Sequence, residues 1–493
     1  MKDDNVAVPQ ANGRPEGGQH EHDLKTFLKV QKDIPHSLPS SSDFDKLASL
    51  GFVNNTARPL AFVRPQDAEQ VSRLIAYLAA NRIPFTVRSG GNNLFGKSQV
   101  DNTVCIDLRS INFCQADQEA QYARIGGGIL FEDLIDTLQS KGLSTVTGMV
   151  PPIGYVGWAT YGGYGPFAWL HGLGHEAIIG AKVVDWRGRI VNADFDLLKG
   201  IRGAGGSFGV IVELTIKVYP LGNFLAGQIM FDESDTKATV RNICRETQRQ
   251  FLRPSSESLY MAPLFIVTPM SKAPFCHVAW LHEDQELGKK EIDKITRLGP
   301  FVYKTTRNTT HAGATDDFKH NFVMPGMKAN IGTMSIYSLT NEVIDVIAHY
   351  VDIMPDVVGA GFAIHSAKEA SKDAADASSF EATEAHFMLE FMAGATSDES
   401  LEVTNKWLQS FLTAMRDTDQ SNILPSTYVN LTPPGQNTLE KAYGHNYDFI
   451  IELQKKYDPH GVFRASPPFA TLASEEGRDT QKATQLKSEL AQL

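Results

Sequence analysis

Glycine is crowded into one part of this 493-residue chain, the segment from Gly90 to Gly209. Three clusters lie there, at residues 88–93, 126–128 and 148–174, and the last of them holds eight glycines. Successive glycines allow backbone N–H groups to converge on an anion, and they allow the backbone to approach a flat molecule closely. One such cluster is equally typical of a tight turn. Three in so short a span predict a binding surface for a large ligand.

The first cluster, Arg88-Ser89-Gly90-Gly91-Asn92-Asn93, follows a predicted strand over 85–88, which is a position that suits a diphosphate. The second cluster precedes a predicted helix over 130–139, and a helix N-terminus is a favourable place for a phosphate. Neither cluster has the GxGxxG spacing and following acidic residue of a Rossmann fold. The sequence therefore predicts a phosphate-bearing ligand on a different fold.

Short β-rich runs and amphipathic helices alternate along the chain, which predicts the α+β class. Val71, Leu74, Ile75 and Leu78 recur at helical spacing after a turn at residues 64–67. The first half has expected strands over 85–88, 104–108, 123–125, 181–185 and 210–218. The second half has longer expected strands over 227–231, 258–263, 277–281, 361–365 and 385–391. Helices are expected there over 287–298 and 342–353, so the second half reads as a sheet with helices on one side.

Composition excludes several function classes. The formal net charge of -11 disfavours nucleic-acid binding, which calls for a basic face. No window approaches the roughly 18 apolar residues of a membrane span, and no signal peptide is apparent, so a cytoplasmic protein is expected. The four cysteines show no CxxC spacing and the fourteen histidines show no HExxH spacing, so we expect no metal.

Several strings, taken in chain order, resemble a known pattern. VRSGGNNLFG at 87–96 is similar to the first flavin loop of the berberine-bridge-enzyme family, and GMVPPIGYVGWATYGGYG at 148–165 is similar to the second. RGAGGSFGV at 202–210, Tyr428-Val429-Asn430, Asn446-Tyr447 and KKYDPHGVF at 455–463 follow the same pattern. The chain thus resembles the berberine-bridge-enzyme and vanillyl-alcohol-oxidase families over roughly residues 43–464.

The resemblance implies FAD as cofactor and an α+β fold with a PCMH-type, two-part FAD-binding domain. It also implies a substrate domain whose antiparallel sheet, flanked by helices, roofs the flavin. The expected organisation is a flexible N-terminal arm (1–42), the FAD-binding domain (43–222), the substrate domain (223–425), a C-terminal segment returning to the FAD domain (426–470) and a polar tail (471–493).

The resemblance also implies which residues contact the cofactor. They come from the two flavin loops, from the segment before the strand over 210–218 and from the C-terminal segment. The expected contacts are Arg88, Ser89, Gly90, Gly91, Asn92, Asn93, Gly96, Val150, Pro151, Ile153, Gly154, Gly157, Thr160, Gly162, Gly163, Gly165, Leu173, Gly209, Val210, Ile211, Asn446 and Tyr447.

Two departures from the family pattern concern the attachment of the flavin. Many relatives bind it covalently through a histidine in the first loop and a cysteine in the second, where this chain has Asn92 and Val150. An amide is a poor nucleophile and valine has none, so the FAD is expected to be noncovalent. The family's oxygen gate falls at Ile153, a residue that decides neither for nor against reaction with O2.

The catalytic residues are less well defined by the pattern. The plant relatives' C-terminal tyrosine base falls at Ala442, with Tyr443 beside it, and the glutamate base of other relatives falls within one residue of Glu390. His386 shares a strand face with Glu390, so the two are predicted to act as acid and base. A solvated charge pair is the alternative. His365 and Tyr260 are further candidates.

The leading hypothesis is an FAD-linked oxidoreductase that oxidises a small organic molecule by hydride transfer to flavin N5, with O2 as electron acceptor. Secondary metabolism is the expected setting, by analogy with the family. A redox-neutral isomerase or cyclase that uses the same pocket is the alternative, and a non-catalytic flavin- or ligand-binding protein is the third. No nucleic-acid or membrane partner is expected, and the pattern does not indicate an oligomeric state.

Overall fold

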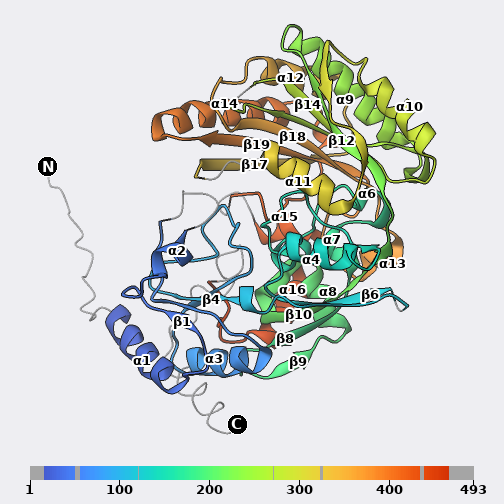
Figure 1. The fold of residues 1–493 in the computed structure, drawn as a ribbon. Helices are drawn as coiled ribbons and strands as arrows, with labels where there is room; N and C mark the ends of the chain where they lie inside the picture. Colours follow the sequence, from blue (N-terminus) through green and yellow to red (C-terminus); the bar gives the residue numbers. More distant parts are fainter. Residues whose placement is uncertain are drawn as a thin grey trace, which may run out of the picture.

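The computed structural model describes residues 16–49, 56–119, 121–269, 271–322, 326–433 and 438–465. The chain forms two stacked parts (Figure 1). The glycine-rich half and the C-terminal segment make one part, and a large sheet with its helices makes the other. The expected boundary at residue 222 falls just before the first strand of the large sheet.

A small sheet and its helices form the N-terminal piece of the glycine-rich part. Its order is β1-β2-β4-β3, and β2 and β3 both run parallel to β4. Helix α3 carries the chain from β2 across to β3, which runs in the same direction on the other side of β4. Asp67 caps this helix by accepting from the backbone N–H of Gln70. The elements are β1 (His36–Ser37), α2 (Phe44–Ala48), β2 (Ala61–Val63), α3 (Ala68–Ala80), β3 (Phe85–Arg88) and β4 (Val104–Asp107).

A second, antiparallel sheet of order β5-β6-β10-β8-β9 completes the glycine-rich part. The short pair β7–β11 lies beside it. The strands are β5 (Cys114–Asp117), β6 (Tyr122–Gly126), β7 (Leu143–Ser144), β8 (Ile178–Val184), β9 (Ile190–Asn192), β10 (Val210–Lys217) and β11 (Tyr219–Pro220). The helices are α4 (Phe131–Gln139), α5 (Tyr155–Ala159), α6 (Ala168–His171), α7 (Gly174–Ala177) and α8 (Phe195–Ala204).

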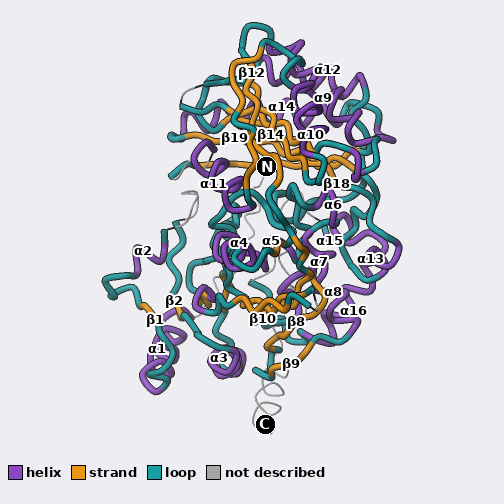
Figure 2. The backbone as a smooth tube through the Cα atoms, turned by 45° about the vertical axis from the view of Figure 1, so that its right-hand side comes forward, coloured by secondary structure: helices purple, strands orange, loops and turns teal. Residues whose placement is uncertain are grey.

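The large sheet has eight strands in the order β15-β12-β14-β13-β18-β19-β17, with β16 also paired to β12, and every pairing is antiparallel. Its strands are β12 (Phe224–Phe231), β13 (Tyr260–Ile266), β14 (Pro274–Trp280), β15 (Phe301–Lys304), β16 (Arg307–Thr309), β17 (Lys328–Ile336), β18 (Ala360–Ala367) and β19 (His386–Ala395). One face carries α9 (Thr236–Leu252), α10 (Gln285–Ile295), α12 (Asn341–Asp352) and α14 (Asp398–Arg416), and the other faces the glycine-rich part (Figures 1 and 2).

The C-terminal segment returns to the glycine-rich part. Its helices are α15 (Leu439–Tyr443) and α16 (Tyr447–Tyr457). Phe463 packs edge-on against Phe85 of β3, with ring centroids 5.9 Å apart. Helix α11 (His311–Phe322) lies between the two parts, and helix α13 (Lys372–Asp376) lies at their side (Figure 1).

Part of the expected N-terminal arm is folded, so the expectation for residues 16–42 was wrong. Helix α1 (Glu16–Val30) buries Leu24 and Leu28 in the core of the small sheet. Phe27 stacks on Tyr77 of α3 with centroids 4.1 Å apart, and the Tyr77 hydroxyl donates to the backbone oxygen of Asp23. Buried apolar area outweighs the polar composition that suggested an arm. The expected polar tail at 471–493 lies outside the described residues.

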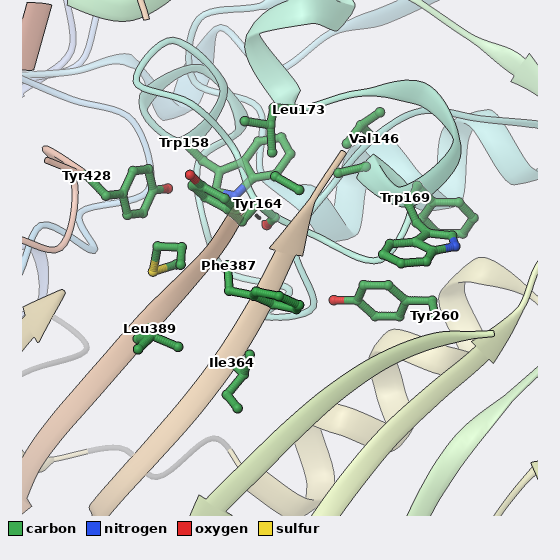
Figure 3. Packing of buried hydrophobic residues seen from close by; sticks show 14 of the residues in the cluster. Val146, Trp158, Tyr164, Trp169, Leu173, Tyr260, Ile364, Phe387, Leu389 and Tyr428 are labelled. Atoms are coloured by element: carbon green, nitrogen blue, oxygen red, sulfur yellow. Dashed lines mark hydrogen bonds between the residues drawn. The ribbon is translucent and has the colours of Figure 1, made fainter. Parts of the chain in front are cut away.

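The two parts share one hydrophobic core. Trp158 and Tyr164 of the loop at 148–165 pack in the same hydrophobic cluster as Phe387 and Leu389 of β19. Figure 3 shows Trp169 beside Tyr260 of β13. A common core holds the large sheet at a fixed distance from the glycine loops. Among the described residues, no helix combines the length and the apolar character that crossing a membrane requires.

Candidate active site

The first loop (87–96) and the second loop (148–165) touch each other through glycines. A Cβ atom added to Gly90 would lie 2.4 Å from the backbone nitrogen of Gly154, and one added to Gly154 would lie 2.3 Å from Oγ of Ser89. No other residue type fits such contacts. The glycines of these loops are therefore required for the close approach of two backbone segments that are sixty residues apart in sequence.

Asn92 joins the two loops by hydrogen bonds. Its side-chain amide donates to the backbone oxygen of Pro152 at 2.7 Å and to that of Gly90 at 3.2 Å. The residue that replaces the family's attachment histidine thus fastens the second loop to the first. Val150 lies at the start of the same second-loop turn, where the backbone N–H of Ile153 donates to its oxygen.

The residues at this junction fit an FAD molecule. Ser89 Oγ is buried and has no hydrogen-bond partner among the described residues, so it can donate to a phosphate oxygen. Gly157 is exposed in an otherwise buried stretch, and a Cβ added there would meet nothing within 4 Å. A donor without a partner and open space in front of a glycine backbone are what a diphosphate and a flat ring require.

Two expectations about the anion site need correction. The Arg88 side chain is wholly buried and donates to Asp107 at 2.6 Å, so it ties β3 to β4 and is not a phosphate ligand. The N-terminus of α4 is no phosphate site either, because its backbone N–H groups at Phe131 and Glu132 donate to the oxygens of Ile153 and Pro151. That helix terminus instead supports the second loop.

A hydrogen-bonded acid–base pair lies on the face of the large sheet that is directed toward the first and second loops. Nε2 of His365 on β18 is 2.9 Å from Oε2 of Glu390 on β19, and the side chains are 26% and 16% exposed. Glu390 is directly opposite Ala363 in the register, so His365 reaches it diagonally. The expected partner of Glu390 was His386, and the structure supplies His365 instead.

His386 is fully buried and bonds to the second loop. Its Nδ1 lies 2.6 Å from the backbone oxygen of Glu384, and its Nε2 lies 2.6 Å from the hydroxyl of Tyr164. Because a carbonyl only accepts, Nδ1 carries the proton, and Nε2 accepts from Tyr164. Burial lowers the pKa of His386 to about 4, so the ring is neutral near pH 7 and does not act as the predicted acid.

Two tyrosines that the sequence analysis did not single out as catalytic stand beside the pair. The rings of Tyr164 and Tyr428 meet edge to face with centroids 4.9 Å apart (Figure 3). Burial raises the pKa of Tyr428 to about 12, and the Glu390 charge adds to that rise. In the sequence, Tyr428 is only part of a motif and Tyr164 is only the residue between Gly163 and Gly165. Neither position predicts that the two rings would be in contact.

Tyr443, the expected catalytic tyrosine, is fully buried on α15 beside Tyr161, and burial raises its pKa well above the usual value. Asn446 is also buried, with its amide 3.1 Å from Nε2 of His445, and Tyr447 begins α16. Tyr260 is buried next to Trp169, with centroids 6.0 Å apart. None of these contacts involves the His365–Glu390 pair.

The remaining expected cofactor contacts fall in three places. The first loop, after β3, holds Ser89, Gly90, Gly91, Asn92, Asn93 and Gly96. The second loop and α5 hold Val150, Pro151, Ile153, Gly154, Gly157, Thr160, Gly162, Gly163 and Gly165, with Leu173 directly before α7. Gly209, Val210 and Ile211 lie at the start of β10, where a Cβ on Gly209 would meet Val183 at 2.3 Å.

Comparison with known proteins identifies an FAD-binding domain and FAD-linked relatives. The FAD binding domain family matches residues 59–194. An FAD-linked oxidoreductase of Gibberella zeae is 27% identical over 449 residues, which cover 90% of this chain and 85% of that protein. The (R)-6-hydroxynicotine oxidase of Paenarthrobacter nicotinovorans is 34% identical over 216 residues, 43% of this chain and 47% of that protein.

Among solved structures, 6-hydroxy-D-nicotine oxidase from Arthrobacter nicotinovorans superposes with a TM-score of 0.76 at 22% identity, covering 88% of this chain and 97% of that one. This likeness shows that the folds are the same. The matched FAD binding domain and the FAD-linked relatives give the class of protein. The chain is an FAD-linked oxidoreductase, and its fold is that of 6-hydroxy-D-nicotine oxidase.

Proposed function

We propose that this oxidoreductase oxidises a small organic molecule of the secondary-metabolite type, with the His365–Glu390 pair as the proton-accepting group. The observation that carries the proposal is the 2.9 Å contact within that pair on the sheet face toward the flavin loops. FAD held at the loop junction by Ser89 and Gly157 would supply the two-electron acceptor, flavin N5, for hydride transfer from a carbon next to oxygen or nitrogen, and O2 would be the final oxidant, reduced to hydrogen peroxide.

The side chains of the pair divide the proton chemistry between them. The Glu390 carboxylate accepts the proton that the substrate's O–H or N–H group loses as the hydride leaves. The His365 imidazole donates to Oε2 of Glu390 and holds that carboxylate in place. The substrate thus loses one hydride and one proton, which balances the reaction. Two buried tyrosines, Tyr164 and Tyr428, close the site on the loop side and exclude water.

FAD is held without a covalent bond in this proposal, because Asn92 and Val150 offer no nucleophile to the ring. Ser89 and Gly157 would instead hold the cofactor through its diphosphate and ring. The relative named for 6-hydroxynicotine is consistent with a small organic substrate. A cytoplasmic location stays a prediction.

The reaction class is tested by anaerobic mixing of the FAD-loaded enzyme with candidate substrates. Loss of the oxidised flavin's visible absorbance, regained with peroxide formation when O2 is admitted, is the expected result. Turnover without loss of absorbance would contradict the proposal and favour a redox-neutral isomerase or cyclase, for which the missing attachment residues leave room. Ligand binding with neither signal would indicate a binding protein.

A further inference from the structure

Solvent reaches the central strands of the large sheet from one side only. In β13, β18 and β19 the partly exposed residues are Ala262, Leu264, His365, Glu390 and Met392, and every other residue is buried. The register places Leu264 opposite Ala363 and Ala363 opposite Glu390, so all five lie on one face. This is the face with the acid–base pair, toward the flavin loops. We call these five residues the sheet platform.

The platform is low at Ala363, which lies opposite Glu390 on one side and Leu264 on the other. The Met392 side chain covers the neighbouring Gly361, since a Cβ added to Gly361 would lie 2.9 Å from Cε of Met392. Two strand spacings separate β13 from β19, about 10 Å, and two residues along a strand span about 7 Å. A surface of this size matches a system of two fused rings.

The platform is apolar except at the pair. Leu264 and Met392 pack with Phe275, Ile266 and Phe318 of α11 in one hydrophobic cluster. In these three strands the partly exposed side chains include no ionisable group other than His365 and Glu390. On the neighbouring strand β17, the hydroxyl of Thr333 is already bonded to that of Thr432 at 2.6 Å. A sugar would therefore find few groups to satisfy its hydroxyls, and burying them unpaired is costly.

Resting on the function proposed above, we infer that the substrate is an uncharged, flat, ring-bearing alcohol or amine and not a carbohydrate. Its rings lie on the sheet platform against Leu264 and Met392, and its oxidisable C–O or C–N group lies at Glu390. Leu264 and Met392 are accordingly specificity-determining residues. Their contribution is apolar contact, so they govern binding of the ring system and leave proton transfer to the pair.

The test measures binding separately from chemistry. The FAD-loaded enzyme is titrated calorimetrically with naphthalen-2-ylmethanol and with xylobiose, without any need for turnover. The alcohol is expected to bind and the sugar is not. Leu264→Gln and Met392→Gln, which keep the side chains similar in size but add an amide, should each raise the Kd of the alcohol about tenfold or more. Both residues are partly exposed, so the variants are expected to fold, which flavin content and thermal melting check.

Val302→Gln is the matched control, because Val302 is an exposed aliphatic residue on β15, the edge strand of the same sheet. It should leave the Kd unchanged. Binding of xylobiose, absence of binding by naphthalen-2-ylmethanol, or an unchanged Kd in both platform variants would overturn the inference. Tight binding of the alcohol with no flavin reduction by any bound alcohol or amine would instead contradict the proposed reaction and leave the platform's preference standing.

Discussion

The hydroxyl of Tyr164 lies 2.6 Å from Nε2 of His386, and this bond joins the second flavin loop to strand β19. The other ring nitrogen of His386 is committed to the backbone oxygen of Glu384, so the histidine can only accept from Tyr164. The tyrosine hydroxyl is thereby oriented with its proton toward the sheet. The bond also fixes the distance between the loop that holds the cofactor and the strand that carries Glu390.

Removing either partner of this bond should cost stability, because each leaves a buried polar atom unpaired. Tyr164→Phe and His386→Leu are each expected to lower the melting temperature, at a cost of about 1–3 kcal/mol. The double variant should lose less than the sum of the two single losses, since both act on one interaction. Thermal melting with FAD in excess measures all four proteins. Strictly additive losses would show that the two side chains are energetically independent.

Glu390→Gln should lower turnover at least tenfold and leave the bound flavin unchanged. The amide keeps the shape of the carboxylate but cannot accept a proton, and positioned acid–base groups contribute about 10²–10⁴-fold to rate. Steady-state peroxide formation and the visible flavin spectrum are the measurements. Glu402→Gln on the exposed face of α14, where Glu402 pairs with Lys406, is the matched control. Unaltered turnover in the Glu390 variant would remove this residue from the mechanism.

Acid precipitation should release the flavin from this protein. Asn92 is engaged with the backbone of Pro152 and Val150 is aliphatic, so neither forms a bond to the ring. After trichloroacetic acid treatment the pellet should be colourless and the supernatant yellow. A yellow pellet that survives washing would show a covalent linkage and sink the prediction.

Stability should fall on mild acidification because of buried histidines. His311 lies between the hydroxyls of Ser144 and Thr147, and burial lowers its pKa from 6.5 to about 3. Between these values the unfolded chain binds a proton that the folded chain does not, so stability decreases as pH falls from 6.5, by about 1.4 kcal/mol per pH unit for one histidine. Above pH 6.5 this contribution is constant.

The melting temperature measured from pH 7 to pH 4.5 tests this dependence. His311→Gln should flatten the acid side of the profile, and His349→Gln, a change at an exposed position on α12, should not. His175 and His386 are buried with pKa values lowered to about 3 and about 4, so some acid dependence remains in the His311 variant. An unchanged slope in that variant would contradict the assignment.

Local pattern predicted many elements of this fold and missed others for physical reasons. The strand over 85–88 is β3 as expected, and the strand over 385–391 is the core of β19. Helix α1 was missed because its polar composition hides the few apolar residues that it buries against α3. Strand β17 was missed because Gly332 interrupts its pattern, although in the sheet it pairs along its whole length with β19.

The residues of the candidate site were also predicted only in part. Alternation along one strand correctly put His386 and Glu390 on one face, but it could not say which side chain across the sheet reaches the carboxylate. That depends on the register that sets Ala363 opposite Glu390 and so brings His365 within 2.9 Å. The two buried tyrosines come from segments that only the closed core brings together.

By itself the sequence indicated the cofactor and the class of protein, because the glycine clusters and the family-like motifs around them are local properties of the chain. The tertiary structure decided the rest: which group pairs with Glu390, where Arg88 points and which face of the sheet solvent can reach. Those are contacts between residues far apart in the chain. Side-chain packing and strand register set them, and neither is encoded in any single segment.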